Sequence, residues 1–313
     1  MILSVSRRTD IPAFYSEWFI NRLRQGYVLI PNPYNTNQLS RISLSPQKID
    51  CIVFWTKNAL PLLRKLDIIE ELGYKNYYFE FTITAYDDKI EKYFPQKEKI
   101  IEVFQRLSDR IGTNRVDWRF DPIIINEQFT ESWILNRFEQ LCKSLAGYTN
   151  KCIISFIDIY RHIRSNFTEI PLMVKENIVK NLVGIASSYN LKLYMCSENQ
   201  DYSSYGLYHS TCIDKEKIES IIGCKLNARK DIGQRKNCGC IESIDIGVYN
   251  TCKHGCSYCY ATEYSTISRI EEMQYNPCYP ILTGYPTGKE NIINKKTVYL
   301  KDYQYSMDCF KEI

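Results

Sequence analysis

Three cysteines lie close together late in the chain, in the stretch CKHGCSYCYA at residues 252–261. Cys252, Cys256 and Cys259 are separated by three and then two residues. Thiolates this close usually hold a metal, but a structural zinc site normally requires a fourth ligand. A cubane [4Fe–4S] cluster is normally held by four thiolates, so three leave one iron open to bind another molecule. We therefore expect this loop to hold a cluster with an open iron.

A structural zinc site is the alternative for the same loop. The CGC at residues 238–240 could donate a fourth sulfur to zinc. We favour the cluster because zinc sites usually combine two paired half-sites, whereas this loop is a lone triplet. We expect His254, inside the loop, to be a hydrogen-bond donor behind the thiolates or a solvent-facing residue rather than a ligand.

A second set of cysteines is predicted to share another metal centre. Cys196 ends a predicted strand, Cys212 lies in an irregular excursion at residues 199–243, and Cys238 and Cys240 precede the last predicted strand. Four thiolates could complete a second [4Fe–4S] cluster or a zinc site, and the alternative is four unrelated thiols. We expect the remaining cysteines to be buried in structural positions: Cys51, Cys142, Cys152, Cys224, Cys278 and Cys309.

The composition is typical of a soluble globular protein. The chain has 313 residues, 44% of them hydrophobic, and a net charge of +4. No apolar run reaches the length of a membrane span, and MILSVSRRTD places its basic residues after a short apolar run, the reverse of a secretory signal. We therefore expect a cytoplasmic protein, in which 13 cysteines indicate metal binding or catalysis rather than disulfides.

Short β-rich runs alternate with segments of helical periodicity. The predicted strands are 2–6, 51–55, 77–83, 116–124, 152–158, 191–196 and 244–249. The predicted helices are 15–26, 99–112, 131–147, 173–190 and a short one at 214–222. This alternation predicts an α/β fold with a parallel sheet, and its repeated unit favours a TIM-like (β/α) barrel, closed or incomplete, over a doubly wound open sheet. We expect a single domain over residues 1–313, with a C-terminal tail at 275–313 wrapped over it.

Polar side chains follow six of the predicted strands at their carboxyl ends, where such barrels carry their active sites. Any one of these residues can be a cap, a turn residue or a structural ion pair. Their occurrence at one end of the sheet indicates a binding site. The set is Arg7, Arg8, Thr9, Asp10, Thr56, Lys57, Asn58, Glu80, Thr82, Thr84, Arg119, Asp121, Asp158, Arg161, His162, Cys196 and Glu198.

The cysteine loop resembles the signature of the radical S-adenosylmethionine (radical SAM) enzymes. Cys252-x3-Cys256-x2-Cys259, with Tyr258 just before the last cysteine, matches that signature in spacing and in its aromatic residue. The resemblance implies a [4Fe–4S] cluster whose open iron binds S-adenosylmethionine (SAM), and reductive cleavage to a 5′-deoxyadenosyl radical that abstracts hydrogen from a substrate. It also implies an electron donor such as ferredoxin or flavodoxin, and places the Tyr258 backbone near the adenine.

The loop occurs later than in most radical SAM enzymes, where it follows the first strand. A circular permutation of the barrel explains this, because strand 244–249 then takes the place of the usual first strand and strand 2–6 becomes its neighbour. The whole chain, from SVSRRTDIP through WRFDP to DIGVYNTCKHGCSYCYA, also resembles an uncharacterised bacterial family whose C-terminal cysteines are likened to the radical SAM cluster site.

The permutation implies which residues meet SAM. The segment that usually binds the methionine amino group, often Gly-Gly-Glu, is replaced in space by SVSRRTD, which contains no such sequence. The implied SAM contacts are therefore Ser6, Arg7, Arg8, Thr9 and Asp10. The implied contacts to the ribose or carboxylate are Glu80, Arg119 and Asp158.

These observations predict a radical SAM enzyme with an unknown substrate. One alternative is a zinc-stabilised binding protein that contacts nucleic acid through RKDIGQRK, at residues 229–236, and through surface tyrosines. Such a charge run is more often a solvated loop. Another alternative is radical-based repair of nucleic-acid lesions, which only the mild basicity supports.

Overall fold

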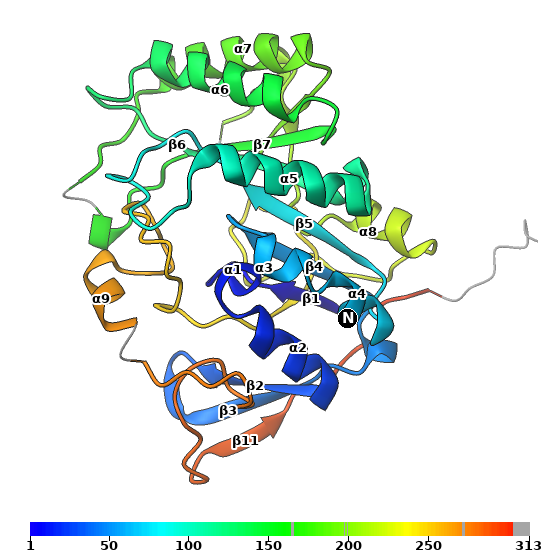
Figure 1. Ribbon diagram of the computed structural model, residues 1–313. Helices are drawn as coiled ribbons and strands as arrows, with labels where there is room; N and C mark the ends of the chain where they lie inside the picture. The colour runs from blue at the N-terminus through cyan, green and yellow to red at the C-terminus, as the bar shows by residue number, and fades with distance from the viewer. Residues whose placement is uncertain (164–165, 197, 199, 271–272, 303–313) are drawn as a thin grey trace, which may run out of the picture.

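An eight-stranded parallel sheet forms the centre of the computed structural model, which describes residues 1–163, 166–196, 198, 200–270 and 273–302 (Figure 1). Its strand order is β10-β1-β4-β5-β6-β7-β8-β9. The strands are β1 (Ile2–Val5), β4 (Cys51–Thr56), β5 (Tyr77–Thr82), β6 (Val116–Ile123), β7 (Lys151–Phe156), β8 (Lys192–Met195), β9 (Tyr208–His209) and β10 (Ile244–Asp245). The predicted α/β architecture with a parallel sheet is confirmed.

Strand β10 lies beside β1, as the permuted order predicts. Leu3 pairs with Ile244, and Ser4 pairs with Asp245, in parallel register. The strand is shorter than the predicted 244–249, because β10 pairs with β1 alone and β1 itself ends at Val5. In the sheet as described, β9 and β10 form the two edges and do not pair with each other.

Amphipathic helices cover one face of this sheet. They are α1 (Ile11–Phe14), α2 (Ser16–Gln25), α3 (Leu60–Leu63), α4 (Leu66–Glu71), α5 (Lys97–Ile111), α6 (Glu131–Leu145) and α7 (Leu172–Ser188). In α5 the buried residues Ile100, Val103, Phe104 and Leu107 recur at helical spacing. They pack in one core with inward residues of the strands, such as Phe79. In α2, α5, α6 and α7, both the first and the last residue lie within two residues of the predicted bounds.

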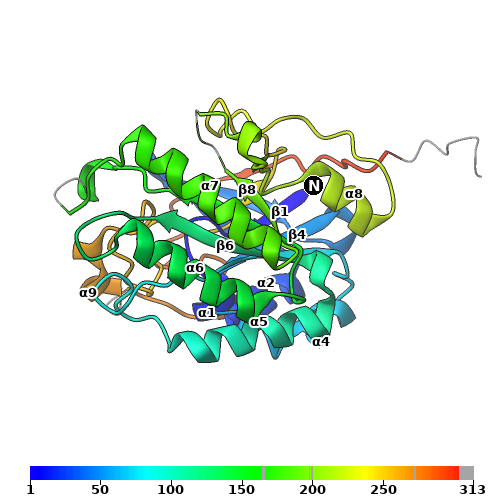
Figure 2. The same ribbon diagram turned by 90° about the horizontal axis from the view of Figure 1, so that it is seen from above.

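The excursion covers the other face of the sheet. Its helix α8 (Lys215–Ile222) lies on the opposite side of the sheet from α5 (Figure 2). Ile218 of α8 packs with Ile2, Val53 and Tyr78. The Tyr78 hydroxyl donates a hydrogen bond to the Cys212 carbonyl at 2.5 Å. The short helix predicted here is confirmed, and residues 197 and 199, at the start of the excursion, lie outside the described residues.

A second, three-stranded sheet was not predicted from the sequence. The hairpin strands β2 (Tyr27–Asn32) and β3 (Asn35–Ser43) are joined by β11 (Asn291–Asn294) from the tail, which pairs with β3 in parallel. The tail also accepts hydrogen bonds from α2, where Trp18 Nε1 donates to the Tyr279 carbonyl at 3.0 Å. Cys278, predicted to be buried, is exposed, and Cys309 lies outside the described residues.

The cysteine loop and a short helix, α9 (Ile267–Ile270), connect β10 to the tail. None of the helices in the described ranges is both long enough and apolar enough to cross a membrane.

Candidate functional site

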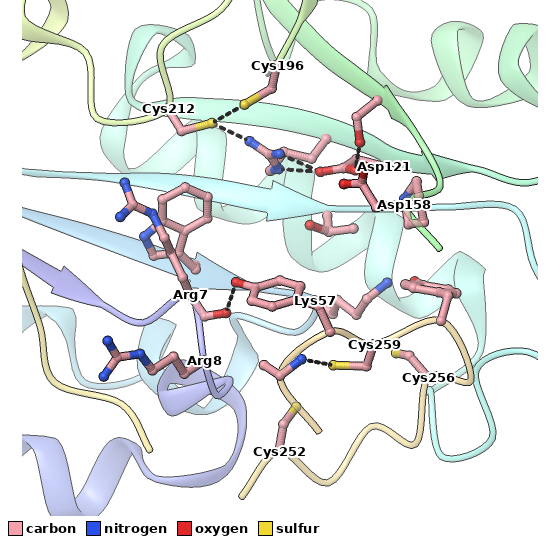
Figure 3. A pocket seen from close by; sticks show the side chains of 18 of the residues that line it. Arg7, Arg8, Lys57, Asp121, Asp158, Cys196, Cys212, Cys252, Cys256 and Cys259 are labelled. Atoms are coloured by element: carbon pink, nitrogen blue, oxygen red, sulfur yellow. Dashed lines mark hydrogen bonds and ion pairs between the residues drawn. The ribbon is translucent and has the colours of Figure 1, made fainter. Parts of the chain in front are cut away.

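A cavity of about 410 Å³ opens at the carboxyl ends of the parallel strands. The cysteine loop forms one side of it and the second cysteine set the other (Figure 3). All the predicted SAM contacts except Glu80 line this cavity, as do all seven predicted metal ligands. The structure therefore brings both cysteine sets and most of the polar strand-end residues into one site at the carboxyl ends of the strands. The predicted strand-end residues that do not line it are Asn58, Glu80, Thr84, Arg161 and His162.

The cysteine loop is held against the segment that follows β5. Ser257 N donates to the Ile90 carbonyl at 2.9 Å, and Tyr93 N donates to the His254 carbonyl at 3.0 Å. Gly255 has a φ of +69°, and a Cβ on it would come within 2.8 Å of the Tyr93 ring. Only glycine satisfies both the backbone and this close approach.

Cys256 is buried, and Cys252 and Cys259 are half-buried. Burial raises the pKa of all three thiols, to about 12 for Cys256. The Ala261 amide donates to Cys259 Sγ at 3.4 Å, and the His254 amide donates to Cys252. Hydrogen bonds of this kind tune the sulfurs of iron–sulfur sites.

The three cysteines of the loop share one side of the cavity, without forming a ready-made site for a single metal ion. Across the part of the chain that the structure describes, no three His, Cys, Asp or Glu side chains converge closely enough to hold one metal ion. Cys252, Cys256 and Cys259 lie together on one side of the cavity (Figure 3).

Asp10 joins the cysteine loop to the first two strands of the site. Its carboxylate accepts hydrogen bonds from Thr56 Oγ1 and the Lys57 amide, both at 2.7 Å, and from the Ala13 amide at 3.0 Å. His254 Nε2 donates to it at 2.7 Å. His254 is therefore buried behind the cysteines and does not face solvent. Asp10, predicted to contact SAM, has its carboxylate occupied by these protein donors.

A buried carboxylate, Glu91, fixes the other side of the loop. It accepts hydrogen bonds from Lys57 Nζ at 2.6 Å and Thr84 Oγ1 at 2.7 Å, and also from Lys97 and the Tyr258 hydroxyl. Burial alone would raise the pKa of Glu91, but the positive charges and hydrogen bonds of Lys57 and Lys97 lower it more. The pKa of Glu91 therefore lies well below its ordinary value. The Tyr258 ring, which lines the cavity, is thereby fixed beside Lys57.

Glu80 and Arg119 form an internal ion pair rather than free ligand contacts. Arg119 Nη1 lies 3.0 Å from Glu80 and donates to Cys212 Sγ at 2.9 Å, while Nε donates to Asp121 at 3.1 Å. Burial raises the pKa of Glu80 to about 7, although Arg119 opposes the shift. Glu80 does not line the cavity, so the structure gives no support to its predicted contact with the ribose or carboxylate.

Asp158 lies at the mouth of the cavity and is half exposed. Arg235 from the excursion pairs with its carboxylate and donates to the Tyr160 hydroxyl at 2.6 Å. Lys230 Nζ donates to the Lys236 carbonyl at 2.6 Å. Part of the basic run at residues 229–236, considered above as a nucleic-acid contact, is therefore engaged within the molecule.

The second cysteine set is brought together. Cys196 Sγ lies 3.3 Å from Cys212 Sγ, and hydrogen bonds connect Cys212 to Cys240 and Cys240 to Cys238. The Ile213 amide donates to Cys240 Sγ at 3.3 Å. The two ends of the excursion thus meet here, as the predicted shared site requires.

Sequence reasoning missed Asp245, which joins β10 to β1. Its carboxylate accepts hydrogen bonds from Ser4 Oγ at 2.8 Å, Ser6 Oγ at 2.6 Å, the Arg7 amide at 2.8 Å and the Gly247 amide at 2.9 Å. The alternating hydroxyls of SVS, together with the acidic residue in IDIG, were the available signal. The contact between these serines and Asp245 could be recognised only once β1 and β10 were known to pair.

Comparison with known proteins finds a family without a known activity. The model of a family described as a domain of unknown function (DUF1848) matches residues 2–261. No curated protein matches the chain. Among solved structures, a "putative alpha-L-fucosidase" from Bacteroides thetaiotaomicron VPI-5482 is 10% identical, with a TM-score of 0.25, over 73% of this chain and 85% of that one. A likeness at that level carries no argument.

Proposed function

The chain belongs to the DUF1848 family, whose function is unknown, and we propose that it is a radical SAM enzyme acting on an unidentified substrate. The observation that carries the proposal is the position of the Cys-x3-Cys-x2-Cys loop. The loop follows β10, whose neighbour is β1, and it faces a cavity at the carboxyl ends of parallel strands. This position suits a permuted, incomplete barrel in which β10 stands where the first strand usually stands.

Cys252, Cys256 and Cys259 would hold the [4Fe–4S] cluster, with one iron left for SAM. When bound, the cluster supplies the electron that cleaves SAM reductively, and a donor such as ferredoxin or flavodoxin would provide it. The chain contributes buried surroundings, amide donors to sulfur, and the cation Lys57 held beside the loop by Glu91.

Arg8 and Thr9 are the residues best placed for SAM on this side of the cavity. Both line the cavity. Arg8 lies on the side of the cysteine loop, although its side chain is directed away from the three sulfurs and its guanidinium carbon lies 5.0 Å from the centre of the Tyr249 ring, whereas the side chain of Arg7 extends toward Cys212 (Figure 3). Thr9 Oγ1 is buried and lacks a hydrogen-bond partner among the residues described. A guanidinium and a hydroxyl together suit the carboxylate and amino groups of a methionine.

We also propose that Cys196, Cys212, Cys238 and Cys240 hold a second metal centre, either a [4Fe–4S] cluster or zinc. The support is the chain of sulfur contacts, beginning with 3.3 Å between Cys196 and Cys212. The buried guanidinium of Arg119, which donates to Cys212 Sγ at 2.9 Å, would stabilise thiolate charge there.

The test is to reconstitute the protein anaerobically with iron and sulfide, then add SAM and dithionite. The expected result is a brown protein with about four irons per chain, or about eight with a second cluster, that forms 5′-deoxyadenosine. A reaction without dithionite is the control and should form none. A colourless protein that retains zinc and forms no 5′-deoxyadenosine would reject the proposal in favour of the zinc-stabilised alternative.

A further inference from the structure

Arg7 presents a cation to the cavity on the side of the second cysteine set. Its guanidinium carbon lies 5.1 Å from the centre of the Trp55 ring. Its Nη2 is buried and has no hydrogen-bond partner among the described residues. Its contact with Asp231 is long, at 3.9 Å, which exceeds a hydrogen bond. Arg7 therefore retains donor capacity that the protein does not use.

The carboxylates that line the same cavity are already engaged. Asp10 accepts its four protein hydrogen bonds, described above. Asp121 binds Arg119 and the Ser155 hydroxyl, and Asp158 binds Arg235. The remaining one is Glu198, which lies 3.5 Å from Lys175 Nζ and accepts from the Phe156 amide at 3.3 Å. Each of these four carboxylates is paired with other protein groups, so none of them neutralises the charge of Arg7. The cavity therefore favours an added anion near Arg7.

Trp55 supplies a second unused donor at the same place. Its ring lies between two guanidiniums, 5.1 Å from that of Arg7 and 5.4 Å from that of Arg119. Its Nε1 is buried and, within the described part of the chain, has no acceptor. A buried donor without an acceptor costs free energy, and an anionic oxygen would remove that cost.

We propose that the substrate carries a carboxylate or phosphate group that binds Arg7, with Trp55 Nε1 beside it, between the two cysteine sets. The inference rests on the proposed function only in treating this cavity as the active site. Arg7 is assigned to the substrate because its side chain extends toward Cys212, whereas Arg8 remains on the side of the cysteine loop (Figure 3). Both anions match the two-donor fork of a guanidinium.

The test is isothermal titration of the anaerobically reconstituted protein with sodium phosphate and with sodium acetate, at constant ionic strength maintained with chloride. Saturable binding of at least one anion is expected, and the tighter of the two identifies the substrate class. Arg7→Gln should weaken that binding about tenfold or more, the loss expected for a charge-assisted hydrogen bond. Arg64→Gln, at an exposed arginine outside the cavity, is the matched control and should leave binding unchanged.

Two further variants test anion binding independently of Arg7→Gln. Arg7→Lys retains the charge but not the fork, and it should also weaken binding. Trp55→Phe retains a ring but removes the donor, and it should weaken binding about threefold or more even if Arg7→Gln does not fold. Wild-type binding of neither anion, or undiminished binding in a folded Arg7→Gln variant, would overturn the inference. Iron content and 5′-deoxyadenosine formation, measured on the same samples, test the proposed function separately.

Discussion

Glu91 is the residue that connects the cysteine loop to the cations of the cavity. It is buried, and it accepts from Lys57, Lys97 and the hydroxyl of Tyr258 at once. Most polar residues of the site were predictable because they lie at the carboxyl ends of the predicted strands. Their partners were not, because Glu91 lies in a loop and meets Tyr258 only through the tertiary fold. For the same reason, Asp10, Glu80 and Arg119 were expected to face a ligand but are occupied by protein groups.

Glu91→Gln is expected to lower the free energy of unfolding by about 3 kcal/mol, because it leaves two lysine ammoniums without their carboxylate. The pKa of Glu91 is lowered in the folded protein, so its stabilisation is complete above the ordinary pKa of 4.5 and decreases as the pH falls below it. Urea unfolding at pH 7 and at pH 4 measures the difference between the variant and the wild type. That difference should be larger at pH 7.

Glu17→Gln is the matched control for Glu91→Gln. Glu17 forms an ion pair with Lys65 at 2.6 Å, but its side chain is 55% exposed. An exposed pair contributes about 1 kcal/mol or less. Equal effects of the two substitutions would show that the buried network does not stabilise the loop.

Seven of the eight strands of the large sheet were predictable because local pattern and tertiary role agree, whereas the two-residue strand β9 was not predicted. Alternating buried strands and amphipathic helices of adequate length give strong signals, as in α5. The small sheet was missed because its signals conflict: Pro31 argues against a strand, and it is tolerated because β2 is an edge strand. Strand β11 has four exposed residues, so its pairing with β3 rather than its own pattern defines it.

The junction between β1 and β10 depends on Asp245. Asp245→Ala removes the acceptor of four hydrogen bonds, among them those from Ser6 Oγ and the Arg7 amide. We expect a loss of about 2 kcal/mol or more in the free energy of unfolding, because partly buried donors are left unsatisfied. Urea unfolding measures it, with Ser4→Ala, which removes one of these bonds, as a milder control. No greater loss in Asp245→Ala than in Ser4→Ala would contradict this role.

The excursion is expected to depend on its own metal centre. A Cys238→Ala, Cys240→Ala double variant removes two of the four sulfurs of the proposed centre. If the centre is a cubane, the variant should lose about four irons per chain and retain about four; if it is zinc, it should lose zinc alone. Metal analysis after anaerobic purification decides between them. Unchanged contents of both metals would show that the four sulfurs hold no metal.

In the whole molecule, the large sheet is an open row of eight parallel strands in which the strand that comes last in sequence, β10, lies at the edge beside the first, β1. The position of β10 beside β1 is the one that the proposed circular permutation of a radical SAM barrel requires. Sequence alone could indicate this only through the late cysteine loop. Whether the sheet closes into a barrel could not be predicted, because most of the excursion at residues 199–243 lacks a periodic pattern.

A circular permutant tests this view of the molecule. The Met1 ammonium and the Leu300 amide both bind the Asp50 carboxylate, so the two ends of the described chain lie close together. A chain that joins residue 302 to Met1 by a short flexible linker and begins after Ile232, which is fully exposed, should fold and bind the same iron. A permutant opened in the exposed bend at residues 126–128 controls for the linker. Failure of the first permutant alone to fold would contradict the view.

The most direct measurement for the central claim is the iron content of a Cys252→Ala, Cys256→Ala, Cys259→Ala variant after anaerobic reconstitution. Cys278→Ala, at an exposed cysteine outside the cavity, is the control and should retain the iron of the wild type. The triple variant should lose about four irons per chain, the content of one cubane cluster, and with them the formation of 5′-deoxyadenosine from SAM. Unchanged iron in a folded triple variant would contradict the account.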